Sequence, residues 1–384
     1  MIYLDNSATT FPKPREVREK MNECMKKYCA NPGRSGHGLS MHINKEIYEC
    51  REKIARMFNV PFAGRVVFTS NTTEALNIAI KGVLKRGGHV IFTSMEHNSV
   101  VRPIYKLSET KGVDFSIARA NIYGYVDPDT IESLIRPDTQ LIVMIHASNV
   151  CGTVNPISAV GSIARRHRIP FLVDGAQTGG VVPIDMEKDN ISMLALAGHK
   201  ALYGPMGTGV LCLGADVNPD TLKEGGTGSN SRDPRQPEEM PDKYESGTVN
   251  AVGICGLSRG IDFINRVGME TIYNHDMYLT KILLEDLSVI KGVDIQGYLT
   301  CTDRLGVVSV TVDGMDCVNV ASVLDDRYGI AVRAGYHCSY MAHDTIGTRD
   351  TGTVRFSIGA FNTVKEIKSA VYAISEICKT GSSV

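Results

Sequence analysis

A cysteine stands in polar and flexible surroundings near the C-terminal end of the chain. Within AVRAGYHCSYMAHD, residues 331–344, Cys338 follows His337 directly, Gly335 by three positions and Arg333 by five. Such a thiol could be a small buried side chain, a metal ligand or a nucleophile. A nucleophilic cysteine needs access to solvent and a thiolate, which nearby positive charge stabilises. No ligand set around this histidine and cysteine has the spacing of a recognisable metal site, which makes the metal ligand the weakest of the three roles. The buried side chain and the nucleophile both stay open on these residues alone.

Two further candidates, Lys200 and Asp174, lie at the ends of apolar runs that predict strands. Lys200, in LAGHKALYGPMGTG, lies where partial desolvation would lower the pKa of a lysine and free its amine to react with an aldehyde. Asp174 ends the run PFLVD, and a carboxylate there needs a cationic partner such as the protonated nitrogen of a pyridine ring. A lysine with an aspartate is the pattern of pyridoxal phosphate (PLP) sites. Taken singly, a surface lysine and a turn aspartate before Gly175 explain the same residues.

Two threonines and a histidine extend this set. Thr72 and Thr73 open a predicted helix directly after a strand, where hydroxyls and unpaired backbone N–H groups suit a phosphate. An ordinary helix N-cap fits the same residues. His97 also follows a strand and could stack on a flat ring and transfer protons, although a structural histidine is the commoner case. Because ligands of open α/β sheets bind at the carboxyl ends of the strands, we expect these side chains at one edge of a sheet.

The elements that must position these residues alternate along the chain. From about residue 65 to 213, β-rich runs such as RVVFTS, HVIFTS and QLIVMIHAS alternate with helical patterns, which predicts βαβ units around a mostly parallel sheet. The polar segment 224–248 predicts a functional or interface loop. A helical stretch from about Asn250 to Leu287 follows. The order of elements then changes, with a helix near 317–328 and a closing helix at 363–379, which indicates a smaller α+β unit.

Composition limits the classes of function. The 384 residues are 43% hydrophobic and 22% charged, as in ordinary globular proteins. The net charge of −1 gives no field that would attract nucleic acid or an anionic membrane. The longest apolar runs, such as LIVMI at 141–145, are too short to span a bilayer, and the opening MIYLDNSATT does not resemble a secretory signal. Ten cysteines without a CxxC pair predict reduced thiols and a cytoplasmic location.

Eight segments, taken in order, resemble the landmarks of the cysteine desulfurases, the NifS/SufS family of PLP enzymes: YLDNSATT, NTTEALN, MEHNS, HASNVCGTVNP, VDGAQ, GHKALYGPMGTGVL, ESGTVN and RAGYHC. GHK and VDGAQ are common to the class V aminotransferases of fold type I, whereas RxGxxC is similar to the SufS-like group II, which also contains selenocysteine lyases. The resemblance implies an α/β fold with a mostly parallel seven-stranded sheet. It also implies a large PLP-binding domain at 13–250 and a small C-terminal α+β domain at 251–384 that takes in 1–12.

The resemblance implies a role for each candidate. Cys338 would attack the sulfur of PLP-bound cysteine, become a persulfide and leave alanine, after Lys200 has held PLP and removed the Cα proton. Arg355 would bind the α-carboxylate of the substrate, with Asn149 and Arg333 on the same side. Thr248 would reach the phosphate of the neighbouring subunit, which implies a homodimer with the active site at its interface. The remaining cofactor contacts would be Asp174 to the ring nitrogen, Gln177 to the ring hydroxyl, His97 stacked on the ring, Asn149 near the ring hydroxyl, and Thr72, Thr73 and His199 at the phosphate.

Three positions depart from the commonest pattern of that family. Ala197 replaces a frequent serine before GHK, Tyr336 replaces the first histidine of RxGHHC, and Ser339 replaces a frequent alanine. A selenocysteine lyase, a class V aminotransferase that would not need Cys338, and a catalytically silent sulfur-relay scaffold are the alternatives. A protein is the expected sulfur acceptor. Iron–sulfur cluster assembly, RNA thiolation and selenium metabolism all stay open as pathways.

Overall fold

The computed structural model describes residues 1–33 and 36–380 of the chain. Its largest sheet has seven strands in the order β2-β8-β7-β6-β5-β3-β4. Strand β8 runs antiparallel to both of its neighbours, and the other adjacent pairs are parallel. The strands are β2 (Val66–Thr69), β3 (His89–Thr93), β4 (Asp114–Ala118), β5 (Thr139–Ile145), β6 (Phe171–Asp174), β7 (Met193–Ala197) and β8 (Gly209–Leu213).

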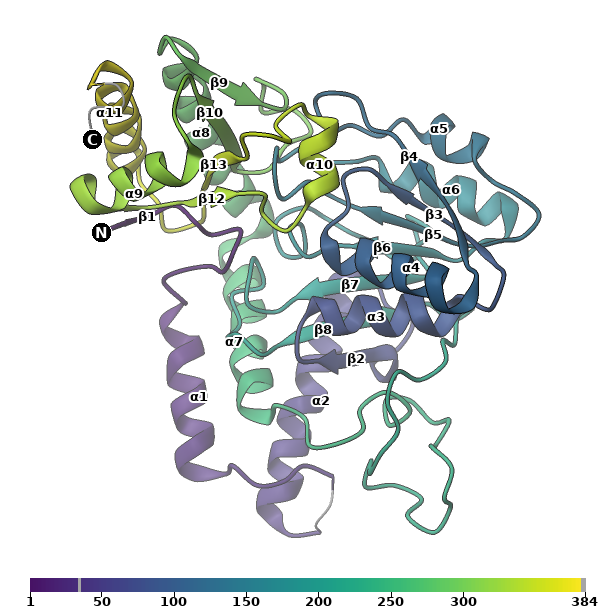
Figure 1. The fold of residues 1–384 in the computed structure, drawn as a ribbon. Helices are drawn as coiled ribbons and strands as arrows, with labels where there is room; N and C mark the ends of the chain where they lie inside the picture. Colours follow the sequence, from purple (N-terminus) through teal and green to yellow (C-terminus); the bar gives the residue numbers. More distant parts are fainter. Residues whose placement is uncertain (34–35, 381–384) are drawn as a thin grey trace.

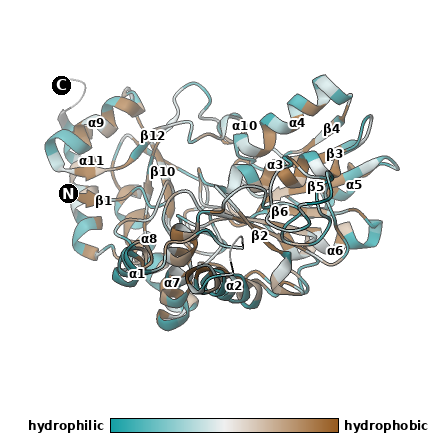
Figure 2. Ribbon diagram, turned by 90° about the horizontal axis from the view of Figure 1, so that it is seen from below, coloured by the Kyte–Doolittle hydropathy of each residue, from teal (hydrophilic) through white to brown (hydrophobic). Residues whose placement is uncertain are grey.

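Both faces of this sheet are covered by helices (Figure 1). Along β3, Val90 and Phe92 pack into one apolar layer with α3 and α4, while Ile91 points into the opposite layer with α2, α6 and α7. This alternation is the period of two expected of a strand buried on both sides. Figure 2 shows the same arrangement as brown strands between helices whose outward faces are teal. The helices are α1 (Arg15–Lys27), α2 (Gly38–Phe58), α3 (Thr72–Val83), α4 (Asn98–Lys111), α5 (Pro128–Ser133), α6 (Ile157–His167) and α7 (Ala251–Val267).

A second, four-stranded antiparallel sheet forms the core of the C-terminal unit, in the order β12-β13-β10-β9. Its apolar cluster takes side chains from α8, α9 and α11. The chain start joins this unit, because β1 pairs in parallel with β11. The elements are β1 (Ile2–Tyr3), β9 (Val293–Gln296), β10 (Val307–Val312), β11 (Ile330–Ala331), β12 (Arg333–Gly335), β13 (Thr353–Ser357), α8 (Met269–Ser288), α9 (Cys317–Tyr328), α10 (Tyr340–Thr345) and α11 (Val364–Thr380).

The helical stretch predicted between Asn250 and Leu287 is two helices rather than one. Gly268, at φ +92°, separates α7 from α8, and this backbone conformation is one that glycine adopts most readily. Helix α7 packs with α1 and α2 beside the large sheet, whereas α8 packs in the C-terminal unit. The division of the chain at residue 250 stays a prediction.

The polar segment predicted as a loop lies between β8 and α7, and neither a helix nor a strand is assigned to it. Glu245 fastens the end of this segment to the body of the protein: its carboxylate accepts from Arg51 at 2.7 Å and from the backbone N–H of Phe68 at 2.6 Å. Among the described residues, no helix combines the length and hydropathy that crossing a bilayer requires.

Candidate active site

The carboxyl ends of β2, β3, β5, β6 and β7 meet at one edge of the large sheet and enclose a pocket of about 170 Å³, which we call the strand-end pocket. The strands are parallel, apart from the inserted β8, so the loops that follow them converge as predicted. The residues predicted from the sequence that line it are Thr72, Thr73, His97, Asn149, Asp174, Gln177, His199 and Lys200.

One end of the strand-end pocket suits an anion. Asn71 caps α3, its side-chain oxygen accepting from the N–H of Glu74 at 2.9 Å, so Thr72 and Thr73 are the first helical residues and not the cap. Helix N-termini attract negative charge through their unpaired N–H groups. His199 adds a buried Nδ1 atom that has no hydrogen-bond partner within residues 1–33 and 36–380. A buried nitrogen of this kind normally has a partner, and a ligand would supply it.

The middle of the strand-end pocket combines a reactive amine with a buried acid. Burial lowers the pKa of Lys200 to about 8, against the attraction of Asp174, and the charges of Arg355 and Arg333 lower it further. Its amine is therefore neutral, and so nucleophilic, in about a tenth of molecules at pH 7 and in about half at pH 8. Burial raises the pKa of Asp174, which accepts from the N–H of Ala176 at 3.0 Å. A cationic ligand group beside Asp174 would favour its charged form.

His97 is a neutral imidazole at the side of the strand-end pocket. Its Nδ1 accepts from the N–H of Ser99 at 3.1 Å and caps α4, so the proton of the neutral ring belongs on Nε2. Burial, together with the charge of Lys200, lowers the pKa of His97 to about 4. Ser99 also lies 2.8 Å from the hydroxyl of Thr73 and thereby joins the two helix starts.

These residues fit pyridoxal phosphate. The strand-end pocket suits a ligand that has an anionic group beside His199, an electrophilic group within reach of the Lys200 amine and a cationic group beside Asp174. Pyridoxal phosphate carries all three groups: a phosphate, an aldehyde and a pyridine nitrogen that can be protonated.

The Cys338 loop is held rigidly against the sheet edge. His337 and Cys338 have φ values of +50° and +59°, a left-handed conformation that costs roughly 1–2 kcal/mol per residue outside glycine. Asn149 donates to the carbonyl of His337 at 2.7 Å and accepts from the hydroxyl of Ser339 at 2.8 Å, while the N–H of Asn98 donates to the carbonyl of Cys338 at 2.8 Å. Asn149, predicted near the cofactor and substrate, thus also fastens the loop.

One arginine contacts the Cys338 sulfur, and a second lies opposite the first in the small sheet. Arg333 donates to Sγ at 3.3 Å, and across the strand pair β12–β13 it is directly opposite Arg355. Arg355 is buried and bonds to the side chain of Asp5 at 2.8 Å and to the carbonyl of Asn149 at 3.0 Å. Its Nε atom has no partner among the described residues, so the guanidinium keeps donors for a ligand.

Sequence reasoning assigned no role to Asp5, Ser99 or Glu96. Asp5 lies inside the YLDNSATT segment, and its position directly after a short apolar run could have identified it as a candidate site residue. Thr248 is exposed and does not line the strand-end pocket, so its predicted contact with a second subunit stays a prediction.

Glu96 is a neutral acid below this edge of the sheet. Its Oε1 accepts from Thr93 Oγ1 at 2.6 Å and from the N–H of Ile145 at 2.8 Å, its Oε2 has no partner, and burial raises its pKa from 4.5 to about 8. A raised pKa stabilises the fold at low pH, and this stabilisation is lost as the pH rises from 4.5 toward 8, at about 1.4 kcal/mol per pH unit.

Glu96→Gln should therefore make the free energy of unfolding less dependent on pH over that interval and should stabilise the protein at its upper end. Urea unfolding at a series of pH values measures the effect. Glu109→Gln, on the exposed side of α4, is the control and should leave the pH profile unchanged. A difference between wild type and Glu96→Gln that stays constant with pH would contradict a neutral Glu96.

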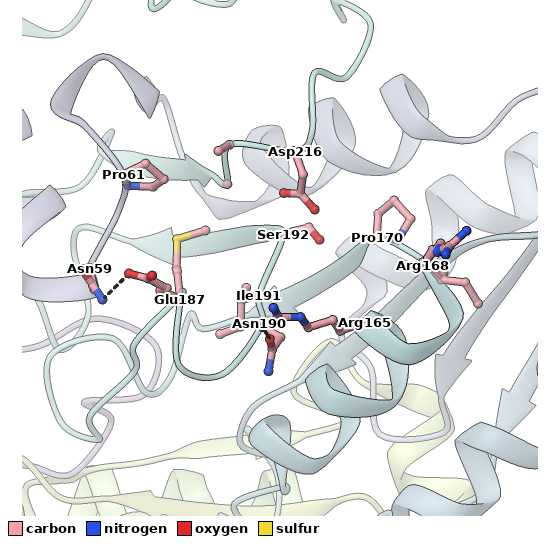
Figure 3. Close-up of a pocket in the computed structure, with 14 residues that line it drawn as sticks. Asn59, Pro61, Arg165, Arg168, Pro170, Glu187, Asn190, Ile191, Ser192 and Asp216 are labelled. Carbon is pink, nitrogen blue, oxygen red and sulfur yellow. Dashed lines mark hydrogen bonds between the residues drawn. The ribbon is translucent and has the colours of Figure 1, made fainter.

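A larger pocket, of about 710 Å³, lies at the opposite edge of the large sheet (Figure 3). It is lined by residues that precede β6 and β7 and follow β8, such as Pro170, Ser192 and Asp216. Arginine and acidic side chains are interspersed around it, and none of the predicted site residues lines it. The strand-end pocket is smaller, but it alone of the two brings the reactive groups together.

Comparison with known proteins places the chain in a family. The family model described as aminotransferase class-V matches residues 2–369, and the chain belongs to that family. A probable cysteine desulfurase of Methanothermobacter thermautotrophicus is 36% identical over 386 residues, which cover 99% of this chain and 95% of the relative.

Solved structures agree with this placement. A cysteine desulfurase of Thermococcus onnurineus solved in its apo form superposes with a TM-score of 0.90 at 31% identity, covering 99% of this chain and 95% of that one. An Escherichia coli cysteine desulfurase with an S-sulfonic acid superposes with a TM-score of 0.88 at 26% identity, covering 97% and 94%. The family resemblance and the α/β fold of PLP-dependent type I, with its mostly parallel sheet, are thereby confirmed.

Proposed function

We propose that the protein is a PLP-dependent cysteine desulfurase that converts L-cysteine to L-alanine and carries the sulfur on Cys338 for delivery to an acceptor. The observation that carries the proposal is the placement of Cys338. Its exposed sulfur accepts from Arg333 at 3.3 Å, and Cys338 lines a cavity that shares Thr73, His97 and Ser99 with the strand-end pocket. Homologues and structural neighbours named as cysteine desulfurases over nearly the full chain support it.

The chain's own residues account for binding and orientation. PLP, when bound, supplies an aldehyde and an electron-accepting ring. His199, Thr72 and Thr73 would hold its phosphate at the start of α3, Asp174 its ring nitrogen and Gln177 its ring hydroxyl, with His97 stacked on the ring and Lys200 as the covalent anchor. Arg355 would bind the α-carboxylate of the substrate through its remaining donors.

Two groups would do the chemistry. The neutral amine of Lys200 accepts the proton from the Cα atom of the substrate, for which a pKa of about 8 suits it. The thiolate of Cys338, beside Arg333, attacks the substrate sulfur. A sulfur–sulfur bond forms and the carbon–sulfur bond breaks. One proton takes the place of sulfur on the Cβ atom and another is returned to the Cα atom, and the products are alanine and a persulfide on Cys338.

The assembly and location of the enzyme belong to the same proposal. The active site would be completed in a homodimer, with the exposed Thr248 reaching the phosphate site of the second subunit. A reducing cytoplasm would keep the persulfide and the acceptor thiol functional, and all ten cysteines are free.

Mass spectrometry of the intact PLP-loaded protein tests this function. After cysteine is added, the expected spectrum shows one extra sulfur atom, and peptide mapping assigns it to Cys338. Alanine should appear in equal amount during a single turnover. Alanine formed without sulfur on the protein, or sulfur on a different cysteine, would contradict the proposal.

A further inference from the structure

A groove of about 450 Å³ opens beside Cys338. It lies at α3 and α4, which cover the same side of the large sheet (Figure 1). Its walls come from these two helices. Asn77 and Lys81 line it from α3, and Arg102 and Lys106 line it from α4. The members of each pair are four residues apart and so lie on one face of their helix. We call this feature the α3/α4 groove.

The α3/α4 groove is continuous with the candidate active site. It shares Thr73, His97 and Ser99 with the strand-end pocket, and the exposed Cys338 lies on its rim. A molecule bound in the groove would therefore lie next to the sulfur without entering the cofactor site.

The α3/α4 groove is strongly cationic for a chain with a net charge of −1. Lys81 and Arg102 form no ion pair with any residue in the described ranges, and the groove is lined by no aspartate or glutamate. Lys106 has a single partner, Glu109, at 3.5 Å; both side chains are mostly exposed, so this pair neutralises little. Like charges across a groove repel one another unless an anion lies between them. The groove is thus suited to an anionic partner.

Its dimensions and rim favour a protein segment over a small anion. Residues four apart on a helix are spaced by about 6 Å along the axis, so the cations extend along the groove instead of converging on one point. Tyr336 and Tyr340 flank the Cys338 loop, with ring centroids 5.9 Å apart, and are 43% and 44% exposed. Tyrosine and arginine are enriched at protein interfaces.

We propose that the α3/α4 groove docks an acidic segment of the protein that carries the acceptor thiol. The inference rests on the proposed function, because it needs a persulfide on Cys338. The acceptor thiolate attacks the outer sulfur of that persulfide. A new sulfur–sulfur bond forms, the bond to Cys338 breaks, and Cys338 leaves as a thiolate beside Arg333, so no oxidant or reductant is consumed. The cations raise the local concentration of the acidic segment.

Two synthetic thiol peptides test the proposal on the PLP-loaded protein. Persulfide is formed with cysteine that carries radioactive sulfur, and its transfer is followed to acetyl-Glu-Glu-Cys-Glu-Glu-amide and to the matching lysine peptide. At low ionic strength the acidic peptide should accept sulfur at least about tenfold faster, and added salt should reduce this preference. Equal rates, or a faster lysine peptide, would overturn the proposal.

A pair of charge reversals locates the effect. Lys81→Glu/Lys106→Glu should abolish the preference for the acidic peptide. Lys291→Glu/Lys365→Glu makes the same change in net charge on exposed residues outside the groove and should retain the preference. Alanine release with dithiothreitol as the acceptor should be unchanged in both variants. A groove variant that keeps the wild-type preference would overturn the proposal.

The remaining outcomes distinguish failure of the docking proposal from failure of the proposed desulfurase function. Failure to label Cys338 in the wild-type protein would overturn the desulfurase function and the docking proposal together. Labelling of Cys338 followed by transfer that ignores peptide charge would overturn the docking proposal alone. Polyuridylate that blocks transfer to dithiothreitol in the wild type, and not in the groove variant, would assign the groove to nucleic acid and overturn docking of a protein.

Discussion

Cys338→Ala should lower the rate of alanine release from cysteine by roughly 10³-fold or more, as the loss of an enzyme nucleophile does. No other cysteine lines the strand-end pocket or the α3/α4 groove, so no second thiol is placed to take the sulfur. The residues proposed to hold PLP are unchanged, so the visible absorbance of the cofactor should persist. Alanine release and the absorbance spectrum of the same preparation measure both.

The control and the alternative substrate make this result specific. Cys29 and Cys338 are the two exposed cysteines, and Cys29→Ala should keep full activity. Selenium leaves carbon more readily than sulfur, so Cys338→Ala should retain turnover of selenocysteine. If cysteine turnover survives in Cys338→Ala with PLP fully bound, the protein is not a desulfurase of the proposed kind, and a selenocysteine lyase or an aminotransferase becomes the better assignment.

Lys200→Ala should lower turnover by roughly 10²–10⁴-fold, the range that loss of a general base produces. It should also remove the covalent attachment of PLP. Borohydride treatment of the wild-type protein should fix PLP to the peptide that contains Lys200. In the variant, borohydride should leave the protein unlabelled, and exchange of the substrate Cα proton with deuterated water should stop.

Lys13 is the matched control for this experiment. Burial lowers its pKa to about 8 as well, but its Nζ donates to Thr10 Oγ1 at 2.7 Å and to the carbonyl of His199 at 2.5 Å, which commits it to a structural contact. Lys13→Ala should therefore keep borohydride labelling at Lys200. Labelling of Lys13 in the wild-type protein would show that the wrong amine has been assigned.

Local sequence rules placed much of the candidate site. Lys200, Asp174, His97 and Thr72 each follow an apolar run, and parallel strands place such positions at a common edge whatever the rest of the chain does. The layers of the sheet followed from apolar runs without polar interruptions. Both predictions depend on periodicity over a few residues, which a single sequence contains.

Contacts between distant segments could not be predicted in this way. The bond of Arg355 to Asp5 joins residues 350 positions apart and exists because β1 adds to the C-terminal unit. The bonds of Asn149 to His337 and Ser339 join residues 188 and 190 positions apart. The break at Gly268 was missed because both flanking segments have helical patterns, and a single glycine is tolerated inside many helices.

The bonds from Asn149 and Asn98 have a consequence for how sulfur could leave the enzyme. They fix the backbone on both sides of Cys338, so this residue cannot move out of the active site to deliver the persulfide sulfur. The acceptor thiol must therefore move to Cys338. Recipients would be selected by reach as well as by charge: a thiol on a pliable tail could arrive at the sulfur, whereas an equally reactive thiol recessed in a stiff surface could not.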